Sequence, residues 1–580
     1  MIKQESNSSE KSLVVHLIII GFHHKKGHQI EYSYPLLNEP IDERWSNLGG
    51  LALPDGVHQR ENDLIYFHLP SLNNQDDYSK TLFGIASYRQ IDANTVTNKE
   101  ADITRNSIQK SVCLILRRPV YGNLSEELKL LTEKYFQEKN FNDRNMFEEF
   151  VDKLNKNPPQ FNLKYYSARD LVIRYRRKTL ILFKLILLQK KVLFMLSPIQ
   201  SLVETIMNLV SLIPNLIETG LNECTLIGER DDIENEINLN ENEDIVFERN
   251  DDKQINFDNI KLKPLKLTND DDNDNDDDDD QSSRISNQFE QTINEDIKNN
   301  LLKRATSITN KLTDTFNRLT SSSSPTSITI NNINNNYSID QYQFSYDLFK
   351  KNNLLHPYIS IHSLDMINNS NINSYLIGAS NRLFRQQNNI DFILTDYDED
   401  FIIQSSLLKQ QLQLTTADLR FTQLFEDSQS NVQSEEEIRR LFKIYLLSLL
   451  CVTRTPNDEA INDFNPLFVK SFQSTDAFRL WQSKGPYPYI DQIIPRHPQA
   501  GQLNVTDVKL RVAHVLDDTE TGRKLKGAFE DTSQFMGEKS RAATKVLGQA
   551  KNSLFSSVIG TFNQGKQWLS KGQPSPPSLD

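Results

Sequence analysis

The chain has 580 residues and a formal net charge of −13, so it is long enough for several domains with cores of their own. Residues 229–280 alone hold 21 acidic and six basic residues, and the remainder is nearly neutral, which excludes a basic nucleic-acid-binding protein. Three widely spaced cysteines, Cys113, Cys224 and Cys451, argue against a disulfide framework and for a reducing compartment.

The first 160 residues read as strands followed by helices. Residues 1–11 are polar, with no secretory signal peptide, and are predicted to be disordered. Apolar or alternating runs then predict strands at 13–20, 29–34, 64–69, 81–90 and 111–116, and a short strand with a turn at 51–56. Helical patterns follow at 125–136 and 145–156. This order is typical of an antiparallel or mixed sheet covered by helices.

Three histidines, His23, His24 and His28, lie in the polar segment after the first strand. Adjacent histidines cannot easily share one tetrahedral metal, no Glu accompanies the i,i+4 pair, and Gly27 disfavours a helix there. We therefore expect no metal. The segment is predicted to be a hairpin tip that contacts solvent or a partner.

Residues 167–220 contain the most apolar part of the chain. Ser167 and Asp170 resemble a capping box, which predicts a helix over 171–188. A polar turn at 189–191 then precedes a buried strand at 192–196 and a second helix over about 200–213. A membrane span needs about 20 predominantly apolar residues, and Lys184 with the lysine pair at 190–191 interrupts the 180–217 region. The pattern predicts the core of an α/β layer.

Residues 225–337 are first acidic and then rich in Asn, Ser and Thr. Such a composition buries too little apolar surface to offset the entropy of ordering, so a disordered insertion inside a domain is predicted. Two interpretations stay open: a regulatory loop tuned by charge or phosphorylation, or a tolerated surface insertion.

Regular patterns resume beyond the insertion. Residues 358–362 and 374–378 are predicted to be the remaining core strands. A second capping box at 415–418 opens helical material, which includes 435–452 and 464–481. Residues 507–514 are expected to close the folded part.

Several blocks of the chain resemble the Avl-type late secretory pathway proteins, which belong to the DENN-domain superfamily. They are 21–27 (GFHHKKG), 51–56 (LALPDG), 83–90 (FGIASYRQ), 101–105 (ADITR), 109–113 (QKSVC), the 167–220 stretch, 381–387 (NRLFRQQ), 415–421 (TTADLRF) and His497-Pro498. The resemblance covers most of the chain except 225–335 and the last few dozen residues.

The resemblance implies an α/β plus α fold, arranged as a tripartite DENN module with a long insertion and an amphipathic tail. The implied parts are an upstream longin-like α/β part, a central α/β part that the insertion interrupts, a downstream helical part and the tail. Their expected boundaries are 12–160, then 161–224 with 338–425, then 426–518 and finally 519–580.

No catalytic constellation stands out in the sequence. There is no P-loop motif and no nucleophile elbow, so no catalytic residue, metal or cofactor is expected. In DENN proteins the recurrent activity is guanine-nucleotide exchange on Rab-type GTPases, which needs only a surface that prefers the nucleotide-free partner. The alternative is a DENN-fold adaptor that binds a GTPase or coat component without exchange.

The surface between the longin-like and central parts is where the resemblance places GTPase binding. Our candidates are polar residues expected at loop or element ends: Tyr34, Asp102, Thr104, Arg105, Gln109 and Lys110. The expected setting is the cytoplasmic side of Golgi-derived vesicles or recycling endosomes, with downstream effects on cell polarity and migration.

The tail has the pattern of an amphipathic membrane-surface helix. Bulky apolar side chains recur at helical spacing opposite a weakly charged polar face, and we expect them to contact membrane: Leu547, Leu554, Val558, Phe562, Trp568 and Leu569. Gly548, Gly560 and Gly565 each lower helix stability by about 1 kcal/mol, so the helix is expected to form only on the membrane.

Overall fold

The computed structural model describes residues 12–38, 40–72, 80–97, 106–228, 343–396, 401–426, 434–455, 457–488, 490, 493–503 and a few positions between 507 and 514. Every helix and strand given below belongs to one compact unit, formed by residues 1–245 and 331–501. The predicted disordered N-terminus, nearly all of the insertion and the amphipathic tail lie outside the described residues.

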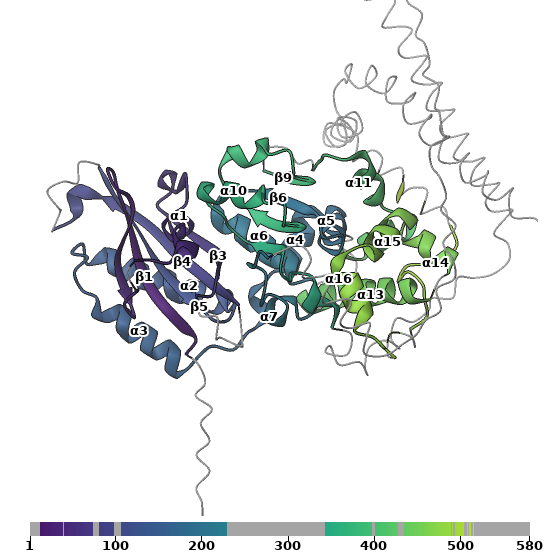
Figure 1. Cartoon of the computed structure of the whole chain (residues 1–580), viewed down its shortest axis with the longest axis horizontal. Helices are drawn as coiled ribbons and strands as arrows, with labels where there is room; N and C mark the ends of the chain where they lie inside the picture. The colour runs from purple at the N-terminus through teal and green to yellow at the C-terminus, as the bar shows by residue number, and fades with distance from the viewer. Residues whose placement is uncertain are drawn as a thin grey trace, which may run out of the picture. The chain divides into compact units, whose positions relative to one another are not determined.

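The N-terminal sheet is antiparallel throughout, in the order β2-β1-β5-β4-β3 (Figure 1). Its strands are β1 (Val14–His23), β2 (Gly27–Tyr34), β3 (Asn62–Pro70), β4 (Thr81–Asp92) and β5 (Ser107–Leu116). Helix α2 (Tyr121–Gln137) packs on β4, and α3 (Asn145–Lys156) packs on β1. The five predicted strands and two predicted helices are confirmed.

The short strand predicted near residue 51 is wrong, because residues Leu48–Ala52 form the one-turn helix α1. Two glycines let this helix approach its neighbours closely. A Cβ on Gly49 would lie 2.5 Å from the Cβ of His28, and one on Gly50 would lie 3.1 Å from the Cβ of Ser360. Close packing on both sides, which the local pattern did not reveal, therefore selects the helix.

The central sheet has the order β10-β9-β6-β8-β7, with four parallel strands and an antiparallel edge strand. Its strands are β6 (Lys191–Met195), β7 (Asn353–His356), β8 (Ser374–Gly378), β9 (Phe392–Thr395) and β10 (Ile402–Ile403). Helices α4 (Ala168–Tyr175), α5 (Lys178–Leu187), α6 (Ile199–Val210), α7 (Leu216–Thr219) and α10 (Leu364–Ile367) accompany them. The predicted buried strand and the helix after it are confirmed.

Two predictions in this region need correction. The helix predicted over 171–188 is two helices, because Arg176 has a φ of 46° and its N–H donates to Val172 O, which ends α4. The strand predicted at 358–362 lies earlier, at Asn353–His356, and the strand has ended by Pro357, which has no N–H to donate to a ladder.

The remaining helices form the C-terminal part of the unit (Figure 1). They are α11 (Ser406–Gln411), α12 (Thr416–Glu426), α13 (Glu435–Arg454), α14 (Asp458–Asp463), α15 (Pro466–Gln473) and α16 (Asp476–Ser483). The second capping box is confirmed, since Thr415 and Asp418 each accept the other's backbone N–H at 3.0 Å. Within the described part of the chain, no helix combines the length and apolarity needed to cross a bilayer.

Candidate functional site

The carboxyl ends of β6, β7, β8 and β9 meet at one edge of the central sheet, where α/β proteins generally bind ligands. Here that edge faces residues from the N-terminal sheet and its loops. The Asp55 carboxylate accepts from Asn381 Nδ2 at 3.3 Å, and the Asp55 carbonyl accepts from Ser380 Oγ at 3.3 Å. Arg60 donates to Ser197 Oγ at 3.3 Å. We call this contact region the carboxyl-edge seam.

Asp63, at the start of β3, caps a helix of the central part. Helix α6 has Pro198 at its N-cap, which offers no side-chain acceptor. The Asp63 carboxylate instead accepts the N–H groups of Ile199 at 3.2 Å and Gln200 at 2.9 Å. Burial raises the pKa of Asp63, against the opposing effect of these backbone donors. The positive end of α6 thus binds a carboxylate from the other sheet.

Two buried histidines form a second contact between the sheets. His68 of β3 places Nδ1 2.7 Å from the carbonyl oxygen of Leu355, and its ring centroid is 6.2 Å from that of His356. Because a carbonyl oxygen only accepts, Nδ1 of His68 carries the proton. Burial lowers the pKa of His68 to about 3 and that of His356 to about 4, so both are neutral at pH 7.

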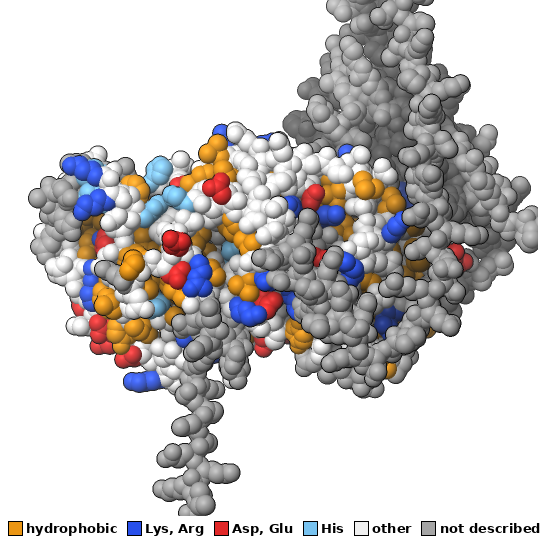
Figure 2. Space-filling view, viewed as in Figure 1, with side chains coloured by type: hydrophobic (Ala, Val, Ile, Leu, Met, Phe, Trp, Pro, Cys, Tyr) orange, Lys and Arg blue, Asp and Glu red, His pale blue; other side chains and the backbone are white. Residues whose placement is uncertain are grey.

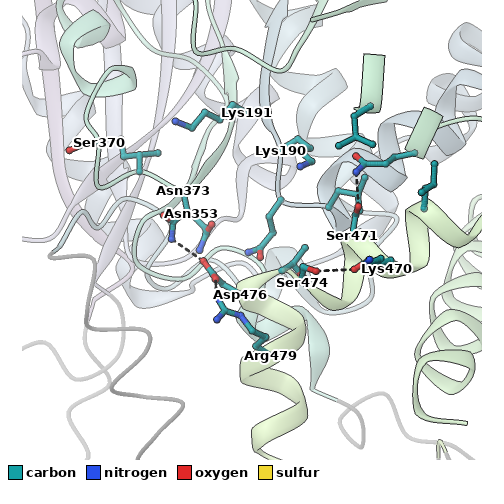
Figure 3. Close-up of a pocket in the computed structure, with 17 residues that line it drawn as sticks. Lys190, Lys191, Asn353, Ser370, Asn373, Lys470, Ser471, Ser474, Asp476 and Arg479 are labelled. Atoms are coloured by element: carbon teal, nitrogen blue, oxygen red, sulfur yellow. Dashed lines mark hydrogen bonds and ion pairs between the residues drawn. The ribbon is translucent and has the colours of Figure 1, made fainter. Parts of the chain in front are cut away.

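The amino edge of the same sheet opens into a cleft of about 790 Å³ against α15 and α16 (Figure 3). We call it the amino-edge cleft. Its described lining is mainly polar, with four basic residues and one acidic residue: Leu188, Gln189, Lys190, Lys191, Asn353, Ser370, Ile372, Asn373, Leu407, Gln411, Leu467, Lys470, Ser471, Ser474, Thr475, Asp476 and Arg479.

A buried ionic network joins the central part to the C-terminal helices. Lys184 of α5 lies 2.6 Å from Asp418, which also accepts from Tyr445 Oη at 2.8 Å and from His497 Nε2 at 3.3 Å. Lys184, Asp418 and His497 have fully buried side chains. Burial alone would raise the pKa of Asp418, but Lys184 and His497 lower it well below its usual range. This cluster is fully paired and therefore structural.

Of the predicted GTPase-binding residues, the three that the structure describes do not lie together. Tyr34 ends β2, where its hydroxyl donates to Asp152 at 3.5 Å. Gln109 and Lys110, which were expected at loop or element ends, are the third and fourth residues of β5 and are buried. Lys110 forms an ion pair with Glu31 and faces the ring of Phe141. Asp102, Thr104 and Arg105 lie outside the described residues.

The predicted hairpin tip is confirmed, with the turn between β1 and β2. The rings of His23 and His24 stack with centroids 4.8 Å apart, whereas His28 Nε2 contacts the Leu53 carbonyl oxygen at 3.1 Å. His362 of the central part lies on the other side of α1, 3.3 Å from where a Cβ of Gly50 would stand. Figure 2 shows histidine side chains on this face, with acidic and basic side chains interspersed.

The sequence patterns missed Asp63, Gln189 and the whole amino-edge cleft. An acid before an apolar strand gives no sign that it caps a helix 136 residues later. The cleft residues come from the α5–β6 turn, the central strands and α15–α16, which are far apart in the chain. The blocks at 51–56 and 381–387 pointed to the seam, since they contain Asp55 and Asn381.

Comparison with known proteins places the chain in a family. A family model described as "Transport protein Avl9" matches residues 14–453. A relative from Schizosaccharomyces pombe, "Late secretory pathway protein avl9", is 33% identical over 183 residues, which cover 31% of this chain and 38% of the relative. "Late secretory pathway protein AVL9" from Saccharomyces cerevisiae is 30% identical over 218 residues, which cover 33% of this chain and 28% of the relative.

The chain thus matches well under half of the length of either relative. The family model, in contrast, extends from β1 to the last turn of α13 and includes both sheets. It covers far more than half of the chain, and the protein therefore belongs to the Avl9 family of transport proteins.

Proposed function

We propose that this protein regulates vesicle traffic in the late secretory pathway, as a DENN-type module that binds a Rab-type GTPase and promotes nucleotide exchange. Family membership and the printed names of the two relatives support the pathway. The observation that supports a DENN-type module is the order of its parts along the chain. An antiparallel sheet with helices comes first, then a mainly parallel sheet, then helices. This is the order that the DENN resemblance implies.

Exchange requires a rigid surface rather than covalent chemistry. A protein that binds the nucleotide-free GTPase more tightly than the loaded form lowers the affinity of the GTPase for nucleotide, and exchange follows when it also lowers the barrier to release. The carboxyl-edge seam supplies rigidity, because Asp63, Asp55 and Arg60 fasten the N-terminal sheet to the central one. A GTPase that contacts both the N-terminal and the central sheet would therefore bind a rigid surface.

Among the candidates that the structure describes, Tyr34 is half-buried at the end of the edge strand β2, whereas Gln109 and Lys110 are buried. Its neighbourhood is negative, since Asp152 and Glu148 raise the pKa of its hydroxyl. A phenol at such a position offers a flat apolar ring and a polar tip, as contact residues at interfaces often do. Gln109 and Lys110 would act indirectly, by holding the end of β5.

A panel of purified Rab GTPases loaded with fluorescent GDP tests the proposal. We expect the full chain to accelerate GDP release from one or a few members, and Tyr34→Ala to reduce that acceleration. Tyr165→Ala is the control, because this tyrosine reaches solvent as Tyr34 does but lies beyond α3. Binding to GTP-loaded Rab without faster release would support the adaptor instead, and no interaction across the panel would contradict both.

The proposed setting is the cytoplasmic face of Golgi-derived vesicles or recycling endosomes, reached through the tail. Flotation of peptide 520–572 with small anionic vesicles tests this step, with helix formation followed by circular dichroism. Phe562→Glu should abolish binding, because it places a charge on the apolar face. A peptide that neither floats nor becomes helical would contradict membrane binding by the tail.

A further inference from the structure

The amino-edge cleft brings together basic side chains from separate elements. Lys190 comes from the turn between α5 and β6, and Lys191 begins β6, whereas Lys470 and Arg479 come from α15 and α16 (Figure 3). Asp476 is the acidic residue among them. It already accepts from Arg479 at 2.6 Å and from Asn373 at 2.8 Å. The lining therefore carries an excess of positive charge.

Two of these cations are not neutralised within the described part of the chain. Neither Lys190 nor Lys470 makes an ion pair with any described residue. Lys470 is exposed and Lys190 is half-buried. Lysines held in one cleft without carboxylate partners attract an anion, and a concave surface focuses that field.

A buried amide supplies an independent sign of a missing partner. The side chain of Asn353, on β7, is 1% exposed, and its Oδ1 accepts from Ser374 Oγ at 2.7 Å. Its Nδ2 donates to no described atom. Buried polar groups are nearly always paired, and Asn353 lines the cleft, so a small movement of its side chain would offer this donor to an acceptor bound there.

The cleft is also held in shape before any ligand binds. Gln189 lies in the left-handed region with a φ of 46°, which a turn residue adopts only when its surroundings require it. Its Nε2 donates to Leu348 O at 3.0 Å, and its Oε1 accepts from Ala477 N at 2.9 Å. This side chain fixes the turn that carries Lys190 against the start of α16.

We propose that the amino-edge cleft binds a polyol carrying two or more phosphate groups, of the inositol phosphate type. Phosphate oxygens pair well with lysine and arginine and accept from an amide N–H. The volume of about 790 Å³ lies in the usual range for small-molecule sites. No aromatic side chain is among the described lining residues, so stacking does not favour a nucleotide base. The site is independent of the proposed GTPase contact.

Titration calorimetry with inositol hexakisphosphate tests the site in the full chain. We expect binding to the wild type and a loss of about tenfold or more in affinity for Lys190→Glu/Lys470→Glu, since two attractions become repulsions. Lys156→Glu is the matched control, because Lys156 is exposed at the end of α3 and should leave the affinity unchanged. Equal weakening by the control would overturn the proposal in favour of non-specific attraction, and so would an absence of binding by the wild type.

Asn353→Asp tests the buried amide, since it replaces the open donor with an acceptor of the same shape. We expect weaker binding and a lower melting temperature, because a carboxylate is costly to bury, and wild-type affinity in the folded variant would contradict the role of the amide. If the variant fails to fold, the Lys190→Glu/Lys470→Glu variant still tests the proposal, because both lysines reach solvent and their substitution should leave the fold intact.

Vesicle binding distinguishes the two possible sources of the phosphate groups, a lipid headgroup and a soluble polyol phosphate. Phosphatidylcholine vesicles with phosphatidylinositol bisphosphate should capture the protein through the cleft if a lipid headgroup is the ligand, and Lys190→Glu/Lys470→Glu should then release it. Vesicles of phosphatidylcholine alone report binding by the tail. Binding of the free phosphate without lysine-dependent capture would assign a soluble ligand.

Discussion

The two edges of the central sheet differ in how their polar groups are used. At the carboxyl-edge seam, Asp63, Asp55 and Arg60 all bond to groups of the central part. At the amino-edge cleft, Lys190 and Lys470 have no ion-pair partner and Asn353 Nδ2 has no acceptor within the described residues. Parallel sheets usually bind ligands at the carboxyl end. Here that end fastens another part of the same chain, and the open polar surface is at the opposite end.

Leu193→Asp should have the largest effect on stability, because it should unfold the central sheet and with it both edges. Leu193 lies in the middle of β6 and is fully buried, between the neighbours β8 and β9. An unpaired buried carboxylate costs several kcal/mol, which is comparable with the whole stability of a domain. Soluble expression with a normal thermal transition would contradict the central position of this strand.

Lys184→Ala should weaken the attachment of the C-terminal helices and thereby test the frame of the cleft. It leaves Asp418 buried without its lysine, which typically costs about 3–5 kcal/mol. The midpoint of urea unfolding measures the change. Lys190→Ala, six residues further along the chain and half-buried, is the control and should unfold as the wild type does.

Acid should weaken the seam through His68 and His356. Both have pKa values below the usual 6.5, at about 3 and about 4, so the unfolded chain binds more protons below neutrality. The stability contribution is present above about pH 6.5 and falls as the pH decreases, by about 2 kcal/mol per histidine between pH 7 and 5. Melting temperatures across this range measure it. His356→Gln should flatten the profile, and an unchanged profile would mean that this pair does not control acid sensitivity.

Asp63→Ala should loosen the seam by a smaller amount. It removes the acceptor for two N–H groups at the start of α6, and the loss of such a cap costs about 0.5–2 kcal/mol. Asp63→Asn keeps an acceptor oxygen and should recover most of the lost stability. A melting temperature that Asp63→Ala leaves unchanged would show that the cap contributes nothing to stability.

Lys470→Ala should have the smallest effect on stability, within about 0.5 kcal/mol, as for other surface substitutions. Its side chain is exposed and makes no ion pair with a described residue, so its removal leaves no group unsatisfied. Differential scanning fluorimetry compares it with Asp63→Ala. A large loss of stability would mean that Lys470 stabilises the fold. The two edges would then not differ in how their polar groups are used.

Local sequence patterns predicted the helices and strands of this protein better than they predicted which of them pack together. The apolar run at 192–196 and the capping serine Ser167 depend on neighbouring residues, and both predictions are confirmed. The positive φ of Arg176 has no signal in the local pattern, and the helix at 48–52 depends on packing against distant segments, which no local pattern contains. The candidate site shows the same limit: block resemblance selected Gln109 and Lys110, but only the strand register shows that both are inside the sheet.

The arrangement of β6 has a consequence for synthesis of the chain. This innermost strand pairs on both sides with strands encoded after the long insertion, and the Lys191 N–H bonds to Asp391, 200 residues later. At roughly 5–20 residues per second, a ribosome needs about 10–40 seconds to supply these partners. During that interval the apolar segments α5, β6 and α6 lack the other strands of the central sheet. We therefore expect nascent chains that end within the insertion to depend on chaperones.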